Sequence, residues 1–312
     1  MKAVVCTAWG PPEVLHLADV ERPTPHKGEV RVRIVATSVT VSDCLVRSLS
    51  FPRRYRVVGR LLLGYHVPRR NIFGMVIAGE IESVGRNVTN FRPGDQVFGL
   101  TRWKAGCYAE YVCYAANGII AAKPANLSYD EAAALPYGGL LALHIVRKAA
   151  IKPGQRVLVY GASGAIGTAA VQLAKHFGAT VTGVCSTTNL ALVESLGAES
   201  VVDYTREDFT TSGERYDVIL DAVGKRKSAK AMLRAGDALA PGGTTISIDD
   251  DFPKINVDDL LTIKRLAESG ELRPVIDRRY TLEEMVEAHR YVDLGHKRGN
   301  VIVTVGDSLY KP

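Results

Sequence analysis

The sequence lacks any apolar run long enough to cross a lipid bilayer. None of its hydrophobic stretches approaches the roughly 18 residues that a membrane-spanning helix needs. The first ten residues, MKAVVCTAWG, enter an apolar strand at once, without the charged, apolar and small-residue sections that make up a signal peptide. We therefore expect neither a membrane span nor a secretory leader.

Cysteine is also scarce, and acidic charge is in the minority. The five cysteines, Cys6, Cys44, Cys107, Cys113 and Cys185, are odd in number and form no C-x-x-C pair, which fits the reducing cytoplasm. The net charge of +6 favours anionic small molecules slightly, but it is too small for a dedicated nucleic-acid-binding protein. With 312 residues, of which 46% are hydrophobic and 23% charged, the chain is long enough for two domains with substantial cores.

The most informative stretch runs from Arg156 to Gly178, RVLVYGASGAIGTAAVQLAKHFG. A β-branched and aromatic run over residues 157–160 predicts a buried parallel strand, and an amphipathic helix follows. The turn between them consists of Gly161, Ala162, Ser163, Gly164, Ala165, Ile166 and Gly167. Glycines spaced by three let the backbone turn sharply and approach a pyrophosphate, which the N–H groups at the start of the helix can bind. The stretch therefore predicts a dinucleotide-binding turn, although it lacks the usual G-x-G start.

The end of the next predicted strand, residues 180–185, indicates which dinucleotide binds. An Asp or Glu at this point would hold the ribose hydroxyls of NAD. The chain has Ser186, Thr187, Thr188 and Asn189 instead, whose neutral groups would not repel a 2′-phosphate and can hydrogen-bond to it. We therefore expect NADP(H) in preference to NAD(H), while Ser186 or Thr187 can also cap the following helix.

Residues 1 to about 120 contain short alternating strands separated by glycine and proline turns. From Ser128, which forms a predicted capping box with Glu131, helices become frequent, and later strands alternate with helices as in a parallel doubly wound sheet. The predicted strands are 2–6, 29–35, 76–84, 96–99, 108–112, 157–160, 180–185, 200–204, 217–222, 244–248 and 300–305. The predicted helices beyond the glycine turn are 189–196, 228–239, 257–269 and 282–294.

Seven segments form a recognisable series: VGRNVTNFRPGDQVFG, AALPYGGLLALH, VLVYGASGAIGTAAVQLAKHFGA, VVDYTREDF, LDAVG, LRPVIDRRYTLEE and AHRYVDLGHKRGN. In this order they resemble the medium-chain dehydrogenase/reductase superfamily, and most closely its zinc-free quinone oxidoreductase branch. The resemblance covers nearly the whole chain. It implies an α/β fold with a GroES-like β-barrel substrate domain (residues 1–122), an inserted Rossmann domain that binds NADP (123–255) and a C-terminal return to the substrate domain (256–312).

Two positions depart from the zinc-dependent members of the superfamily. Where those have the cysteine of a C-x-S-D loop, this chain has Thr40 before Val41, Ser42 and Asp43, and the G-H-E motif is replaced by Gly74-Met75-Val76. Zn²⁺ needs thiolate, imidazole or carboxylate ligands, which Thr, Met and Val do not provide. The four-cysteine structural zinc lobe is missing too, so we expect a protein without metal.

A further departure lies between the predicted strand 244–248 and the helix that begins near residue 257. The family usually places another helix and an edge strand here, and that edge is often used for dimer pairing. This chain has only residues 249–256, DDDFPKIN, too few for a crossover connection. We therefore expect a sheet with fewer strands, and a homodimer through the usual edge is in doubt.

Without zinc, the easiest reaction for a nicotinamide is hydride transfer to an already electrophilic carbon, as in a quinone or an α,β-unsaturated carbonyl. Hydrogen-bond donors must then stabilise the oxyanion or enolate that develops. Hydroxyl groups suffice, and the candidates are Thr40, Ser42, Tyr65 and Tyr137, with Tyr108 as a further tyrosine. Any of these tyrosines can instead be a half-buried packing residue. Asp43 is either a proton relay or, as the resemblance implies, a residue that orients the loop.

The resemblance adds cofactor contacts at Tyr204 near the adenosine phosphate and at Val223, Gly224 and Asn300 on the nicotinamide side. His66, His144 and His289 stand alone in the sequence, and His144 is expected to be a core histidine. An enoyl-thioester reductase and a non-enzymatic NADPH-binding protein, like the lens crystallins of this branch, remain alternatives.

Residues 47–70 are rich in arginine, with no acid and with interleaved aromatic residues. The arginines are Arg47, Arg53, Arg54, Arg56, Arg60, Arg69 and Arg70. Such a segment can hold an anionic partner, including a phosphate-bearing substrate such as an acyl-CoA, or it can be a solvated face, which we favour. We expect no nucleic-acid partner.

Overall fold

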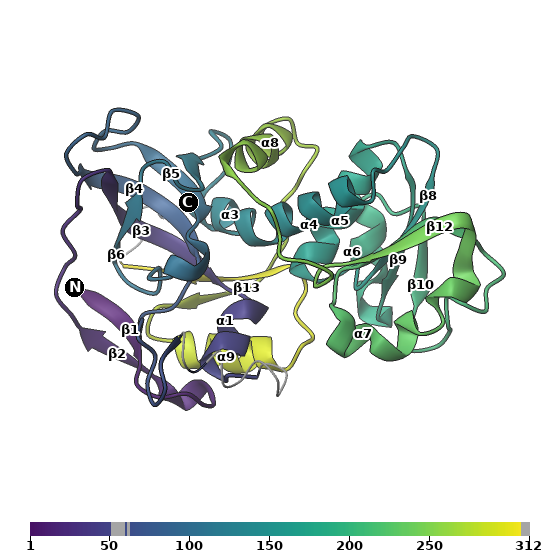
Figure 1. Ribbon diagram of the computed structural model, residues 1–312, viewed down its shortest axis with the longest axis horizontal. Helices are drawn as coiled ribbons and strands as arrows, with labels where there is room; N and C mark the ends of the chain where they lie inside the picture. Colours follow the sequence, from purple (N-terminus) through teal and green to yellow (C-terminus); the bar gives the residue numbers. More distant parts are fainter. Residues whose placement is uncertain (51–59, 61–62, 307–312) are drawn as a thin grey trace. The chain divides into compact units, whose positions relative to one another are not determined.

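The computed structural model describes residues 1–50, 60 and 63–306, and the chain forms two compact units (Figure 1). The first unit combines Met1–Pro136 with Ile276–Pro312, and the second is Tyr137–Val275. The predicted boundaries, after residues 122 and 255, lie earlier in the chain. Residues up to Pro136 group with the first unit, and residues 256–275 group with the second unit.

The first unit is built on a seven-stranded sheet in the order β13-β14-β3-β4-β5-β7, with β6 paired to β3. Its strands are β3 (Glu29–Val39), β4 (Val76–Val84), β5 (Gln96–Leu100), β6 (Tyr111–Ala115), β7 (Ile120–Ala122), β13 (Ile276–Thr281) and β14 (Asn300–Thr304). A separate antiparallel pair joins β1 (Lys2–Cys6) to β2 (Leu15–Asp19). Alternate residues of β3, such as Val30, Val32 and Ile34, are buried, as expected for a strand with one face on the core.

The described residues of this unit also form three helices and two 3₁₀ turns: α1 (Val41–Arg47), α3 (Tyr129–Ala133), α9 (Met285–Asp293), η1 (Pro12–Val14) and η2 (Arg102–Lys104). The predicted strand at 108–112 is wrong by three residues, because β6 begins at Tyr111. Tyr108 is instead fully buried, with its backbone N–H bonded to Phe73 and its carbonyl accepting from Val4. The strands β2, β7 and β13 and the helix α1 were not predicted.

The second unit is a parallel sheet in the order β10-β9-β8-β11-β12. Its strands are β8 (Arg156–Tyr160), β9 (Thr180–Cys185), β10 (Ser200–Asp203), β11 (Tyr216–Asp221) and β12 (Leu239–Ser247). Its helices are α4 (Pro136–Lys148), α5 (Ala165–His176), α6 (Leu190–Ser195), α7 (Lys225–Met232) and α8 (Val257–Glu268), with 3₁₀ turns η3 (Thr187–Asn189) and η4 (Ala235–Ala238). The strand order reverses between β8 and β11, which is where doubly wound sheets bind their ligands.

The predicted doubly wound sheet is therefore confirmed, and it is short. Within the described residues β12 is an edge strand, and the chain passes from it to α8 through residues 248–256 without another strand. This connection is fixed to α4 by ion pairs, since Asp251 contacts both His144 and Lys148.

Candidate cofactor site and active site

The glycine turn lies between β8 and α5, where it was predicted. Gly161 has φ +80°, a value that disfavours other residues, and a Cβ there would come within 2.3 Å of Val223 Cγ2. A Cβ on Gly167 would lie 2.0 Å from the Gly161 carbonyl oxygen, so α5 can approach the turn only because residue 167 has no side chain. A Cβ on Gly164, in contrast, would meet only the Gly161 oxygen, at 3.6 Å. The helix thus packs as closely against the turn as a dinucleotide-binding site requires.

The start of α5 is suited to an anion. Gly164 is its N-cap, with no side-chain cap, and its carbonyl accepts the first helical bond from Thr168 at 2.8 Å. The N–H groups of Ala165, Ile166 and Gly167 lie in the first turn of α5, where backbone N–H groups have no acceptor within the helix. Ser163 is half-buried beside them. These groups fit a pyrophosphate.

The segment after β11 forms the wall opposite Gly161. Asp221 is fully buried, and its Oδ1 accepts the backbone N–H groups of Val223 and Gly224 at 3.0 and 3.1 Å. Its Oδ2 accepts the hydroxyls of Ser228 and Ser247 at 2.6 and 2.8 Å. Asp221 begins the segment that the resemblance assigns to the nicotinamide side, and it fixes the turn that carries Val223 and Gly224.

Asn189 joins the glycine turn to the end of β9. Its Nδ2 donates to Ser186 Oγ at 3.0 Å and to Ser163 Oγ at 3.3 Å. Its Oδ1 is buried and has no hydrogen-bond partner among the residues that the structure describes. An unused buried acceptor is costly unless a ligand or water supplies a donor. A ribose hydroxyl is such a donor, so this site fits a dinucleotide.

A carboxylate lies beside these neutral residues in space. Asp203 ends β10, opposite Cys185 of β9, and its Oδ2 accepts the Thr187 hydroxyl while Oδ1 accepts the Thr205 hydroxyl at 2.7 Å. The bond from Thr187, followed by that from Thr205, holds the pKa of Asp203 below its usual value. Thr187 therefore donates its hydrogen to Asp203. The end of β9 is neutral in sequence, but it has an anion next to it in space.

Two other residues predicted to contact the cofactor, Tyr204 and Asn300, belong to different units. Tyr204 follows β10 in the second unit and is 50% exposed, so its ring is free to contact a ligand. Asn300 begins β14 in the first unit and is buried.

Thr40 and Ser42 lie together at the start of α1. Thr40 is the N-cap: its hydroxyl donates to Asp43 Oδ2 at 2.6 Å, and its oxygen accepts the Asp43 backbone N–H at 3.2 Å. Asp43 in turn accepts the Thr40 backbone N–H at 2.9 Å, which completes a capping box. Ser42 is half-buried in the same turn. Asp43 thus orients the loop, as the resemblance implied.

Asp43 is buried in surroundings that favour its neutral form. Burial raises its pKa to about 6, in spite of the opposing hydrogen bonds from Thr40 and interactions with Tyr108 and Gly74. The Tyr108 hydroxyl is buried and interacts electrostatically with Asp43, but no hydrogen bond of normal geometry involves it among the described residues. Burial, followed by the nearby Asp43 charge, raises the pKa of Tyr108. Tyr108 is thus a core residue beside Asp43.

The remaining candidates differ in exposure. Tyr65 is 63% exposed, with its ring edge-on to His66 at 4.7 Å between centroids. Tyr137 is half-buried in the first turn of α4, in the second unit. His144 is mostly but not fully buried, with 12% of its side chain exposed, and its Nε2 lies 3.0 Å from Asp251 Oδ1.

His289 belongs to a buried network that the sequence did not reveal. Arg47 is only 2% exposed, and its Nη1 donates to His289 Nδ1 at 2.7 Å while Nη2 contacts Asp293 Oδ2 at 2.5 Å. Cys44 Sγ also lies 3.4 Å from His289 Nδ1. Burial, followed by the Arg47 charge, lowers the pKa of His289 to about 3. Arg47 therefore belongs to the core, which corrects its place in the arginine-rich segment.

The rest of that segment lies partly outside the described residues, which leave out Arg53, Arg54 and Arg56. Arg70 Nη1 donates to the Trp103 carbonyl at 2.9 Å. Across residues 1–50, 60 and 63–306, no three His, Cys, Asp or Glu side chains are grouped so as to hold a metal ion. No helix in that part of the chain is long and apolar enough to span a membrane.

Comparison with known proteins agrees with this geometry. Residues 26–124 match the alcohol dehydrogenase GroES-like domain family, and residues 165–287 match the zinc-binding dehydrogenase family. The tomato (Solanum lycopersicum) 2-methylene-furan-3-one reductase is 32% identical over 97% of this chain and 79% of its own. The chloroplastic NADPH-dependent alkenal/one oxidoreductase of Arabidopsis thaliana is 29% identical over the same shares of the two chains.

Among solved structures, the quinone oxidoreductase of Coxiella burnetii superposes with a TM-score of 0.88 at 30% identity, covering 98% of this chain and 99% of that one. The GroES-like and Rossmann parts, the glycine turn and this similarity along almost the entire chain agree. The chain therefore belongs to the medium-chain dehydrogenase/reductase superfamily, in its quinone oxidoreductase-like branch, and is a nicotinamide-dependent oxidoreductase.

Proposed function

We propose that this protein uses NADPH, without a metal ion, to reduce a quinone or an α,β-unsaturated carbonyl compound. The proposal rests on a closely packed glycine turn at Gly161–Gly167. It also rests on two hydroxyl residues, Thr40 and Ser42, in the loop where zinc-dependent relatives have a metal ligand. The names of the tomato and Arabidopsis relatives, a furanone reductase and an alkenal/one oxidoreductase, support a conjugated carbonyl as the substrate.

The preference for NADPH rests on the residues at the end of β9. Ser186 and Thr188 are neutral, and Thr188 is exposed. The exposed ring of Tyr204 offers an adjacent stacking surface. Asp203 opposes this preference through its negative charge, which the hydroxyl groups of Thr187 and Thr205 screen in part by donating hydrogen bonds to it. We assign the 2′-phosphate to Ser186, Thr188 and nearby backbone N–H groups.

The bound cofactor supplies a hydride to the electrophilic carbon, and the protein must stabilise the charge that develops on oxygen. While Asp43 is ionised, the Thr40 hydrogen points to Asp43 Oδ2. A protonated Asp43 can instead donate to Thr40 Oγ, which frees the Thr40 hydrogen for a substrate oxygen. Because the pKa of Asp43 is raised to about 6, this exchange of donors is accessible near neutral pH.

The role of Thr40 is tested by comparing Thr40→Val with Thr40→Ser. We expect the valine variant to lose turnover by about 10²-fold, the usual effect of a lost oxyanion donor, while KM for NADPH stays unchanged. The serine variant should retain most of the activity. Equal activity of both variants with the unchanged protein would show that Thr40 only caps α1.

A substrate panel tests the function itself. Purified protein treated with a chelator is mixed with NADPH or NADH and with quinones, enals, enones, enoyl thioesters or, in the reverse direction, simple alcohols. We expect oxidation of NADPH by quinones or enones, and poor turnover of alcohols, since alcohol oxidation needs a Lewis acid or strong base at the reacting carbon. Turnover of alcohols alone would refute the proposal.

Other outcomes of the panel identify the alternatives. Turnover confined to enoyl thioesters would make the protein an enoyl-thioester reductase. Tight NADPH binding with no turnover of any compound would indicate a non-enzymatic binding protein. Loss of activity on chelation, restored by zinc, would overturn the metal-free part of the proposal.

A further inference from the structure

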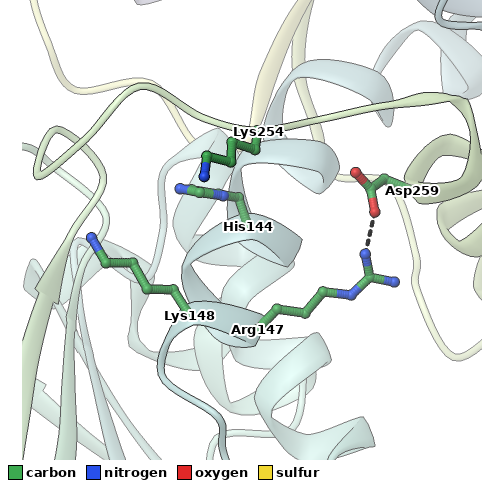
Figure 2. Close-up of a pocket in the computed structure, with 5 residues that line it drawn as sticks. All are labelled: His144, Arg147, Lys148, Lys254 and Asp259. Carbon is green, nitrogen blue, oxygen red and sulfur yellow. Dashed lines mark hydrogen bonds and ion pairs between the residues drawn. The ribbon is translucent and has the colours of Figure 1, made fainter.

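A cavity of about 270 Å³ lies in the second unit, between α4, the 248–256 connection and the first turn of α8 (Figure 2). Its lining residues are His144, Arg147, Lys148, Lys254 and Asp259. None of these belongs to the cofactor or catalytic candidates described above. Three of the five side chains are arginine or lysine and a fourth is an imidazole, so basic groups predominate in the lining.

The acidic residue of the lining is already used. Asp259 Oδ1 accepts a hydrogen bond from Arg147, and Oδ2 accepts the backbone N–H of Asn256 at 3.0 Å as part of the α8 capping box. Figure 2 shows Arg147 turned towards Asp259, whereas the nitrogen ends of His144, Lys148 and Lys254 point to the other side. The cationic groups on that side do not face Asp259.

The nearby carboxylates of the connection compensate only part of this charge. Asp251 Oδ1 pairs with His144 Nε2 and Oδ2 with Lys148 Nζ, both at 3.0 Å. Asp250 pairs with Lys225 at 2.7 Å, and its Oδ2 also lies 3.6 Å from Lys148 Nζ. Lys254 has no carboxylate partner in the part of the chain that the structure describes. One lysine is thus unpaired next to His144, which Asp251 holds, and next to Lys148, which Asp250 and Asp251 share.

We propose that this cavity is a binding site for a small oxyanion of the phosphate class, held by His144, Lys148 and Lys254. A lysine ammonium offers three donors around a compact charge, which suits a tetrahedral anion. Hydrogen bonds between charged donors and phosphate oxygens are short and strong. Exposed carboxylate pairs are weak by comparison, so the anion can displace Asp251 from His144 and Lys148.

The site follows from the short connection between β12 and α8. Because residues 248–256 form no further helix or strand, they pass directly to α8 and bring both Lys254 and Asp251 to α4. Asp251 occupies the donors in the absence of an anion. Removal of its charge should therefore strengthen anion binding, and removal of Lys254 should weaken it. This inference does not depend on the proposed reaction.

Isothermal titration with inorganic phosphate at constant ionic strength tests the site. We expect one phosphate to bind at this site in each chain. Lys254→Gln and Lys148→Gln should each weaken binding about tenfold or more, because each removes a charge-assisted hydrogen bond. Asp251→Asn should tighten binding. Lys152→Gln is the matched control, since it removes the same charge from an exposed lysine outside the lining. Phosphate held only at the glycine turn would bind equally to all variants, and this result would overturn the proposal.

A second measurement locates the anion. Crystals soaked in tungstate, an oxyanion of similar shape, should show the metal atom beside His144, Lys148 and Lys254, and density at the glycine turn alone would contradict the site. A parallel titration with phenyl phosphate identifies the source. Tighter binding than that of inorganic phosphate would indicate an organic phosphate ester, and equal or weaker binding would indicate the free anion.

Discussion

The glycines of the cofactor turn are required for different reasons, and this difference can be measured. Gly167 permits α5 to contact the Gly161 carbonyl, whereas Gly164 has space for a methyl group within the protein itself. Absence of a side chain at Gly164 therefore matters only when a ligand approaches the N-terminus of α5.

We expect Gly164→Ala to change the free energy of unfolding by less than about 1 kcal/mol while weakening NADPH binding about tenfold or more, because the methyl group obstructs the phosphates. Gly167→Ala should destabilise the fold by roughly 2–3 kcal/mol through overpacking. Denaturant unfolding and a fluorescence titration of each variant provide the test. If Gly164→Ala bound NADPH normally, the phosphates would not lie where we place them.

We expect cofactor discrimination to depend on Asp203, because its carboxylate accepts the Thr187 hydroxyl at the end of β9 and would oppose a 2′-phosphate there. We expect Asp203→Asn to raise the ratio of NADPH to NADH affinity by several-fold, since the asparagine can still accept the Thr187 hydrogen. Titration with both cofactors measures the ratio, and a shift towards NADH would indicate that Asp203 does not face the 2′-position.

Asp43 should give the stability of the protein a distinct pH dependence. Its pKa rises from an ordinary 3.8 to about 6 because of burial, so between these pH values the folded state binds more protons than the unfolded state. The contribution of Asp43 to the free energy of unfolding is therefore fully present below pH 4. It falls by roughly 3 kcal/mol as the pH rises through 6.

The comparison with Asp43→Asn isolates this effect from the other carboxylates. Urea unfolding of both proteins between pH 4 and pH 7 should show the unchanged protein losing stability relative to the variant as the pH rises. Parallel pH curves would mean that Asp43 ionises normally. The groups near it include Thr40, Cys44, Cys107, Tyr108 and the Gly74 backbone.

At the scale of elements, helix α1 is held by a long-range polar contact as well as by its own cap. Thr40 and Asp43 close its N-terminus, and Arg47 at its other end contacts His289 and Asp293 of α9. The helix has only seven residues, too few to be stable alone, so its position depends on α9.

We expect Arg47→Met to lower the free energy of unfolding by about 2–4 kcal/mol, because His289 loses its buried donor and Asp293 its partner. Arg290→Met is the control, as its ion pairs with Glu13 and Glu287 are exposed and should contribute less than about 1 kcal/mol. Chemical unfolding of both variants tests this. Similar losses would show that the buried network contributes no more than a surface pair.

At the scale of the molecule, the shortened Rossmann sheet limits how copies of the chain can associate. The family's usual pairing edge lies beyond β12, and here residues 248–256 lead to α8 instead of forming an edge strand. The resulting edge carries Pro241, which cannot donate a ladder hydrogen bond.

We therefore expect the protein to be a monomer at micromolar concentration. Light scattering coupled to size-exclusion chromatography measures the mass directly. A stable dimer that Thr244→Pro, a substitution in β12, converts to a monomer without loss of folding would show that β12 pairs between copies after all.

The sequence by itself determined the features that depend on neighbouring residues. The strand, glycine turn and helix over residues 156–178 were predicted in place, because apolar periodicity and the conformational freedom of glycine act over a few residues. The short sheet followed in the same way from the length of the segment 249–256. The capping pair Ser128 and Glu131 was also evident, since it spans a single helical turn.

Only the tertiary structure decided which distant side chains meet. Asp203 lies beside Thr187 because β10 pairs with β9 in one register, and Arg47 reaches His289 because α1 packs against α9. Neither contact leaves a local pattern in the sequence, since register and helix packing are set by the burial of many residues at once. For this reason the class of cofactor could be predicted from the chain, whereas the charge beside it and the buried network around His289 could not.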